Sequence, residues 1–564
     1  MSTNLSRVVF ASMALFFACF FVLPIVSTVK AAFVTADGGF TFDYVLAIFQ
    51  NELYRQGLAN SLVIAFWTTL GSLLVAIPLA VVYVRFEFPG KTILNSLVLT
   101  PMILPPFVGA IGIKAMLGQA GALNSFLAAF GLMNRAHPYD WLGGGSLLGI
   151  VVMEVLHLYP ILYLNAAAAL ANVDPALEEA AASLGCEPAR RFWRVTLPLI
   201  MPGVFAGGTI VFIWAFTELG VPLVFDYTRV TSVQIFSAIK DLNGNPFPYA
   251  LVVVMLVLSA LIYALGKRLF GSAGADGGGR AATARETIVL PRKWGLACTV
   301  AFSLVTFLAV IPHIGVVFLS VARDWYATVL PSSFTLAHYH DALGHELTLS
   351  SIANSLKYSS LATFLDLVLG IGVAYVVVRT NIRGRQLLDA MAMLPLAVPG
   401  LVLAFGYLAM SREGRSFHWL MLGENPLLLL VIAYSVRRLP YVVRSAAAGL
   451  QQVSPALEEA AQNLGATPER ALWRITLPLV APNLIAGGLL AFAFAMLEVS
   501  DSMILAQQAA HYPVTKAIYS LISALGNGPS LAAALGVWAM IFLAVTMIGA
   551  GIILGKKLGA IFKA

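Results

Sequence analysis

Two carboxylates occupy equivalent places in segments of the sequence that are otherwise apolar enough to cross a membrane. Glu218 and Glu498 lie 280 residues apart, and Asp226 and Asp501 follow them. An ionisable side chain is costly inside a bilayer, so each of these acids is a functional candidate. Carboxylates at matched positions can bind a cation or form a gate. The alternative is that they lie at the outer surface of the membrane and bond to helix ends.

Two arginines present the opposite charge in the apolar segment 426–448. Arg437 and Arg438 lie about half way along it, where the first half of the chain has His157 and Leu158. Guanidinium groups at that depth must face protein or a water-filled cavity. They can form ion pairs with the acids or contact an anionic solute, and the sequence does not decide between these. The predicted solute path consists of Glu218, Glu498, Asp501, Arg437 and Arg438.

The segments that carry the two glutamates each follow a polar stretch that occurs twice. Residues 173–208 and 453–488 align without a gap and are identical at 22 of 36 positions. Each copy is charged and contains several prolines, whereas the surrounding chain is apolar. This repetition indicates a functional segment rather than a segment that only spans the membrane.

Each copy is predicted to form a helix, a turn and a second short helix. Asp174 or Ser454 can cap the first helix, and a proline follows at the first helical position. Gly185 and Gly465 suit the left-handed residue that ends such a helix. We call this helical part of each copy, up to the Leu-Pro pair that precedes the next membrane segment, the knuckle.

The spacing within each knuckle resembles the EAA loop of permease subunits of binding-protein-dependent ABC importers. Glu-Ala-Ala is followed after three residues by Gly, and after nine more by a hydrophobic residue and Thr-Leu-Pro. The one departure is Val195, where the pattern usually has Ile. The residues that the resemblance assigns to coupling with an ATPase are Glu179, Ala180, Ala181, Gly185, Glu459, Ala460, Ala461 and Gly465.

The resemblance covers nearly the whole chain and implies a fused permease of the type I ABC importer fold, with both halves of the pore in one polypeptide. Such a permease works with two copies of an ATP-binding subunit and with a periplasmic or surface-tethered solute-binding protein. The chain looks most similar to permeases for ferric iron, with organophosphonate, thiamine or a similar small charged solute as alternatives. We therefore expect a transport subunit of the bacterial inner membrane, and not an enzyme.

The composition also indicates an integral membrane protein. Of 564 residues 59% are hydrophobic and 11% are charged, and the mean hydropathy is +0.86. Because about 20 apolar residues span a bilayer, the chain is predicted to contain about twelve transmembrane helices in an all-α fold. Residues 8–29 are expected to be an uncleaved first helix. Lys and Arg gather on the side of both termini, which predicts that the termini are cytoplasmic.

The predicted helices form two parallel six-helix repeats, because an even number of spans returns each repeat to the same orientation. The first half is 1–270 and the second is 295–564, each with its own knuckle. Residues 271–294 are rich in Gly and Ala and are predicted to be a cytoplasmic linker. Both knuckles should then emerge on the same face of the membrane.

Other sites are predicted to be absent. Gly90-Lys91-Thr92 resembles the end of a phosphate-binding P-loop, but Arg85 stands where that motif requires Gly. ATP is therefore expected on a separate subunit, with no cofactor in this chain. The net charge of +7 follows the membrane topology and is not concentrated in a basic, aromatic-rich soluble segment, so no nucleic-acid partner is expected.

A metal site is not expected either. His338, His340 and His345 lie close together in the sequence, but they align without gaps with residues 41–56, which contain no histidine. An amphipathic helix at the outer surface explains this segment better than a ligand set does. The three cysteines are scattered and predict neither a disulfide nor a zinc site.

Two other classes of membrane protein can be compared with the permease. A secondary transporter driven by an ion gradient also has about twelve spans in parallel halves, but it gives no role to two matched cytoplasmic knuckles. An integral-membrane enzyme would need a cluster of His, Asp or Cys residues at active-site spacing, which the sequence lacks.

Overall fold

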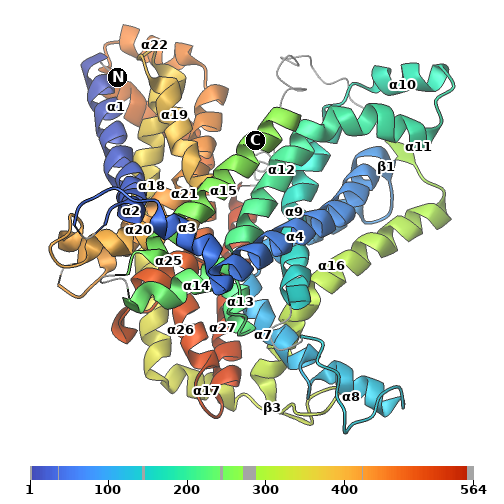
Figure 1. Cartoon of the computed structure of the whole chain (residues 1–564). Helices are drawn as coiled ribbons and strands as arrows, with labels where there is room; N and C mark the ends of the chain where they lie inside the picture. Colours follow the sequence, from blue (N-terminus) through green and yellow to red (C-terminus); the bar gives the residue numbers. More distant parts are fainter. Residues whose placement is uncertain are drawn as a thin grey trace.

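The computed structural model describes residues 3–35, 37–142, 147–241, 245–270, 287–421 and 423–554, and these residues are mostly helical (Figure 1). Ten helical segments in this part of the chain are long and apolar enough to cross a membrane. A bent helix pair, Arg385–Leu396 and Gly400–Ser411, adds an eleventh span if it is counted as one. The predicted all-α membrane fold is confirmed.

In the first half, the described residues form helices, short helical turns and one strand. They are α1 (Thr3–Phe17), η1 (Ala18–Val22), α2 (Leu23–Phe33), α3 (Asp43–Gln50), α4 (Glu52–Arg85), β1 (Phe86–Glu87), α5 (Lys91–Val98), α6 (Thr100–Ile103), α7 (Pro106–Leu117), α8 (Ala122–Ala129), α9 (Leu147–Ala171), α10 (Pro175–Ser183), α11 (Pro188–Arg191), η2 (Phe192–Thr196), α12 (Leu197–Thr217), α13 (Gly220–Val224), α14 (Thr231–Ser237), η3 (Ala238–Asp241) and α15 (Phe247–Phe270).

The second half repeats this order with small differences. Its elements are β2 (Ile288–Val289), α16 (Arg292–Val321), β3 (Ala322–Asp324), β4 (Ser333–Phe334), α17 (Ala337–Gly344), α18 (Glu346–Arg379), α19 (Arg385–Met393), η4 (Leu394–Leu396), α20 (Gly400–Ser411), η5 (His418–Met421), α21 (Leu427–Gln452), α22 (Pro455–Asn463), α23 (Pro468–Ala471), η6 (Leu472–Thr476), α24 (Leu477–Met496), α25 (Ser500–Leu505), η7 (Ala509–His511), α26 (Val514–Ile522) and α27 (Gly528–Leu554).

The third membrane segment of each half is broken. Residues 93–116, which are numerous enough for a single span, are divided among α5, α6 and α7, and the second half bends by 97° between Arg385–Leu396 and Gly400–Ser411. Pro105 and Pro399 precede α7 and α20 in extended conformation. A proline has no N–H to donate to the preceding turn, so the helix ends there and restarts in another direction.

Helix α21 accounts for the difference between the predicted twelve spans and the ten or eleven that composition supports. It is 26 residues long, which is enough to cross a bilayer. It carries Arg437, Arg438 and Arg444, so it does not meet the limit on charge that the other segments meet. Its arginines therefore need partners inside the protein.

The first membrane helix of each half packs on the other half. α1 and α2 contact α18, α19 and α20, while α16 contacts α5 and α7. In Figure 1 the blue α1 lies beside the yellow α18 and α19. A Cβ atom at Gly112 would overlap the carbonyl oxygen of Pro312, and one at Gly406 would press against that of Pro24. Glycine is required at both contacts because the two backbones approach so closely.

The predicted linker lies mostly outside the described residues. Its end pairs with the turn after α4, since β1 and β2 form a parallel two-stranded ladder in which Phe86 is opposite Ile288. α16 begins at Arg292, two residues before the predicted end of the linker. The second half is thus attached to the first at the C-terminal end of α4.

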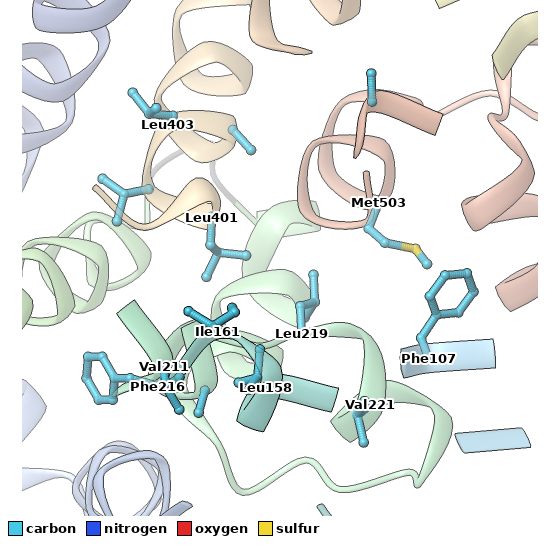
Figure 2. Close-up of a cluster of buried hydrophobic side chains, with 14 of the residues drawn as sticks. Phe107, Leu158, Ile161, Val211, Phe216, Leu219, Val221, Leu401, Leu403 and Met503 are labelled. Carbon is cyan, nitrogen blue, oxygen red and sulfur yellow. The ribbon is translucent and has the colours of Figure 1, made fainter. Parts of the chain in front are cut away.

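Buried apolar side chains fill the region between the halves (Figure 2). Figure 2 shows side chains from α7, α9, α12 and α13 of the first half close to those from α20 and α25 of the second. The labelled residues are Phe107, Leu158, Ile161, Val211, Phe216, Leu219, Val221, Leu401, Leu403 and Met503. The two halves therefore share one core.

Candidate functional site

Both knuckles adopt the predicted helix-turn-helix. Asp174 accepts a hydrogen bond from the N–H of Ala176 at 2.9 Å at the start of α10, and Ser454 plays the same part for α22 at 3.3 Å. Gly185 and Gly465 then take φ values of +79° and +91°. This left-handed region is easily reached only by glycine, so it directs the chain back into α11 and α23.

Each knuckle continues without a break into the fifth membrane helix of its half. A π-helical turn joins α11 to α12 and another joins α23 to α24. Pro188–Val224 and Pro468–Met496 are each long and apolar enough to span the membrane. Figure 1 shows α10 and α22 at the same edge of the molecule. Unbroken helical backbone therefore joins α11 to α12 and α23 to α24.

The first glutamate of each pair anchors its knuckle. Glu178 is buried and accepts hydrogen bonds from the Arg85 guanidinium and from the Thr196 hydroxyl, both at 2.5 Å. Arg85 is the last residue of α4. The contact therefore ties the knuckle to the C-terminal end of a second membrane helix.

The second half repeats this anchor. Glu458 is buried, forms an ion pair with Arg379 at 3.4 Å and accepts a hydrogen bond from Thr476 at 2.9 Å. The predicted coupling residues Glu179 and Glu459, in contrast, are exposed. The two glutamates of each pair thus have different environments: one faces the protein and the other faces out.

The outward side of each knuckle is apolar as well as acidic. Leu184 and Leu464 are 89% and 91% exposed, and Leu177 and Leu457 are about half exposed. The alanines and glycines assigned to coupling are exposed or half-buried around them. Matched leucines in water at the same place on both halves are typical of a surface that another protein covers.

The anchoring role of Glu178 can be tested by comparing its substitution with that of the adjacent, exposed Glu179. Glu178→Ala should leave the Arg85 guanidinium without its carboxylate and loosen the knuckle, so that trypsin cleaves after Arg190 and Arg191 at least about tenfold faster. Glu179→Ala is the matched control, since that side chain is exposed, and its cleavage rate should equal that of the wild type. Equal rates in the two variants would contradict the anchoring role.

A cavity of about 150 Å³ lies between the halves, at the ends of the helices that follow the knuckles. Its polar lining comes from both halves and consists of Glu154, His157, Thr217, Glu218, Arg437, Arg438, Tyr441, Glu498 and Ser500. A second cavity of about 370 Å³ shares Met102, Trp214 and Tyr441 with the first and reaches Asn165 and Arg444, which lie nearer to the knuckles. The second cavity therefore lies next to the first and nearer to the knuckles.

The second-half wall of the cavity is an ion cluster. Glu498 is buried and accepts hydrogen bonds from both Arg437 and Arg438, and Arg437 also lies 3.6 Å from the carboxylate of Asp501. Arg438 lies over the ring of Phe494, 5.6 Å from its centroid. Two guanidinium groups and two carboxylates thus compensate one another within the wall.

A glycine leaves the space that the Arg437 guanidinium of this cluster occupies. A Cβ atom at Gly400 would overlap the Arg437 guanidinium. The first half has Pro106 and His157 at the corresponding positions. The glycine at the start of α20 therefore makes room for an arginine that the first half does not have.

The first-half wall has a different arrangement. Glu218 lies just after α12, and its carboxylate accepts hydrogen bonds from the N–H groups of Gly220 at 2.8 Å and Val221 at 3.3 Å. Within the described residues no Lys, Arg or His lies within 4.0 Å of the Glu218 carboxylate. Glu218 and Glu498, equivalent in the sequence, thus differ in their partners although both line the same cavity.

Residues 72–272 and 366–550 match the family described as binding-protein-dependent transport system inner membrane component, one match in each half. The chain belongs to this family.

Three relatives extend over most of the permease. The ferric transport system permease protein of Actinobacillus pleuropneumoniae is 27% identical over 81% of this chain and 64% of its own length. A putative ferric transport system permease protein of Haemophilus influenzae is 27% identical over 82% of this chain and 70% of its own length. A probable ABC transporter permease protein of Sinorhizobium fredii is 29% identical over 83% and 82%. The chain therefore spans less than two thirds of the length of the first of these relatives.

Three buried charged residues of the permease were missed by the sequence analysis. Glu154 in α9, Asp366 in α18 and Lys516 in α26 are each less than 10% exposed. The first two lie in long apolar helices, so the rule that marks ionisable residues in spans as candidates would have found them. Asp366 accepts a hydrogen bond from Ser435 at 2.6 Å, and Lys516 donates one to the carbonyl of Met503 at 2.8 Å.

The three histidines His338, His340 and His345 do not come together. His338 is buried against the carbonyl of Ala322 at 2.8 Å, His340 is 93% exposed, and His345 caps α18. They lie in and after the short helix α17, where the sequence predicted an amphipathic helix. Asp226 is also exposed and pairs with Lys114 at 2.6 Å, so it is separate from the cavity acids.

Proposed function

We propose that this permease forms the transmembrane path of an ABC importer that carries ferric iron into the cell. One observation carries the proposal: two matched knuckles on one face are each continuous with a helix whose far end lines a single charged cavity between the halves. Two relatives that extend over most of the chain are named as ferric transport permeases. The proposed setting is the bacterial inner membrane, with the knuckles and both termini in the cytoplasm.

In the proposed mechanism an ATP-binding subunit docks on each knuckle, and a solute-binding protein delivers solute to the opposite face. The exposed docking residues are Glu179, Ala180, Gly185 and Leu184, with their equivalents in α22 and the turn after it. Closure of the two ATPase subunits on ATP pulls the knuckles together. Because α11, η2 and α12 are continuous, as are α23, η6 and α24, the pull reaches Glu218 and Glu498 at the cavity.

Two alternatives to an ATP-driven iron importer can be compared with the structure. An organophosphonate or a similar solute with an anionic group could use the arginines of the second-half wall, and thiamine could use the acids. An ion-gradient-driven transporter would use the cavity but would give no role to the anchored, outward-facing knuckles. The first alternative concerns only the solute, whereas the second concerns the energy source.

The test uses the purified permease with its ATP-binding subunits in proteoliposomes, supplied with the iron-loaded binding protein. We expect iron uptake that requires ATP, is abolished by vanadate and is unaffected by a protonophore. We also expect the permease alone to bind no nucleotide analogue, because Arg85 interrupts its P-loop-like segment. Uptake that collapses with a protonophore and persists in vanadate would overturn the proposal.

A further inference from the structure

The two walls of the cavity between the halves are not equally available to a solute. In the second-half wall Glu498 is occupied by Arg437 and Arg438, and Asp501 lies 3.6 Å from Arg437. A cation that approached these acids would have to displace a guanidinium and would meet two fixed positive charges. In the first-half wall, the part of the chain that the structure describes places no Lys, Arg or His within 4.0 Å of the Glu154 or Glu218 carboxylate.

Glu154 is the residue that distinguishes the first-half wall. It is 1% exposed and lines the cavity, and within the described residues its Oε1 atom has no hydrogen-bond partner. Burying a carboxylate without a partner is expensive, so such a group is expected to have a partner in another state of the protein. Glu154 lines the cavity, so a cationic occupant of the cavity would supply the partner that this oxygen lacks.

His157 and Glu218 complete this wall. His157 lies one helical turn after Glu154 on α9, on the same face. Its Nδ1 atom lies 2.8 Å from the carbonyl oxygen of Pro101. Since a carbonyl only accepts, Nδ1 carries the proton and Nε2 keeps the lone pair that can bind a metal. Glu218 is oriented by the N–H groups of Gly220 and Val221.

We propose that Glu154, His157 and Glu218 form a transit site for a hard, multivalent metal cation on its way between the halves. The proposal rests on the importer function above and specifies where its cargo is held. Carboxylate oxygen with one imidazole nitrogen suits a hard or borderline cation, and not a soft one that prefers sulfur. Met102 is the only sulfur-bearing residue in the cavity lining.

The geometry favours passage over storage. Within the described residues no three His, Cys, Asp or Glu side chains converge on a single point that could hold a metal. The three groups therefore do not form a closed coordination shell in this structure. A transport path needs binding that is strong enough for entry and weak enough for release, and a closed cage would not release its ion.

The test measures binding of terbium(III), a hard trivalent cation, to the purified permease in detergent. Trp214 lines both cavities, so excitation of tryptophan should sensitise terbium emission when the ion is bound there. We expect Glu154→Gln and Glu218→Gln each to weaken terbium binding at least about tenfold, because the charge count of the ligands sets affinity for such ions. Trp214→Phe should remove most of the sensitised emission without changing affinity measured by calorimetry.

Glu52→Gln is the matched control, since its side chain is 81% exposed at the outer end of α4, and its affinity should equal that of the wild type. Glu154→Asp provides a second variant if the glutamine variant does not fold. Unchanged terbium affinity in folded Glu154 and Glu218 variants, or equal loss in Glu52→Gln, would overturn the proposal.

The two proposals fail in different ways. If ATP-dependent, vanadate-sensitive iron uptake occurs but terbium affinity is unchanged in the Glu154 and Glu218 variants, the transit-site proposal is wrong and the importer proposal is supported. If terbium binding depends on these residues but no ATP-dependent uptake of any solute occurs with the ATP-binding subunits present, the importer is wrong and the cation site stands.

Discussion

Glu498→Gln should strongly lower the thermal stability of the purified permease, whereas Glu218→Gln at the equivalent position should leave it close to that of the wild type. Glu498 is the only carboxylate within 4.0 Å of Arg438 in the described chain, and it also binds Arg437. Removing one partner of a buried ion pair typically costs about 3–5 kcal/mol. At Glu218 a glutamine keeps an oxygen that can accept from Gly220.

Thermal unfolding in detergent, followed by tryptophan fluorescence, measures this difference. The double variant Glu498→Gln with Arg438→Leu should recover much of the lost stability, because it removes the guanidinium that has no other partner. Leucine is also the residue that the first half has at this position, Leu158. Equal losses of thermal stability for Glu498→Gln and Glu218→Gln, or no recovery in the double variant, would show that the cluster does not stabilise the fold.

Replacing Leu184 and Leu464 by aspartate should abolish association with the ATP-binding subunits while the permease still folds. Both side chains are about nine-tenths exposed, so the change costs the permease little by itself. If a partner covers them, each contributes about 1.5–3 kcal/mol by its burial. Each docking site should then weaken by about ten- to a hundredfold, and a buried aspartate adds a further penalty.

Co-purification of the ATP-binding subunits with the permease checks this result. Leu525→Asp is the matched control, because Leu525 is 99% exposed in the loop between α26 and α27 and not on a knuckle. That variant should co-purify normally. Normal co-purification of the double knuckle variant would remove these leucines from the proposed interface.

The knuckles could be predicted in detail because local chemistry determines them. A capping residue, a proline at the first helical position and a glycine that tolerates positive φ specify a helix and its end within about a dozen residues. Because the segment is repeated, the same prediction applied to both knuckles. The exposed and buried roles within each pair of glutamates were not predictable in this way, because the partners Arg85 and Arg379 lie about 80 to 90 residues earlier in the sequence.

The cavity was predicted only in part. The spacing identified Glu218, Glu498 and the arginines, but equivalence in sequence suggested equal roles for the two glutamates. Their environments differ because His157 and Pro106 are replaced by Arg437 and Gly400 in the second half. Glu154 lies in an apolar span, so the rule for ionisable residues in spans applies to it, but it was not predicted because comparison of the two halves gave it no charged counterpart. Such pairings depend on tertiary packing, which a local pattern does not contain.

The positions of α1, α2 and α16 have a consequence for how the protein is made. α1 and α2 contact α18, α19 and α20, which begin more than 300 residues later in the chain. At roughly 5–20 residues per second of synthesis, the first helices wait in the bilayer for tens of seconds before these neighbours exist. During that time lipid must cover the surfaces at which Pro24 later meets Gly406. Neither half can reach its final packing alone, so a ribosome that stops after the first half leaves an unfinished membrane bundle rather than half of a pore.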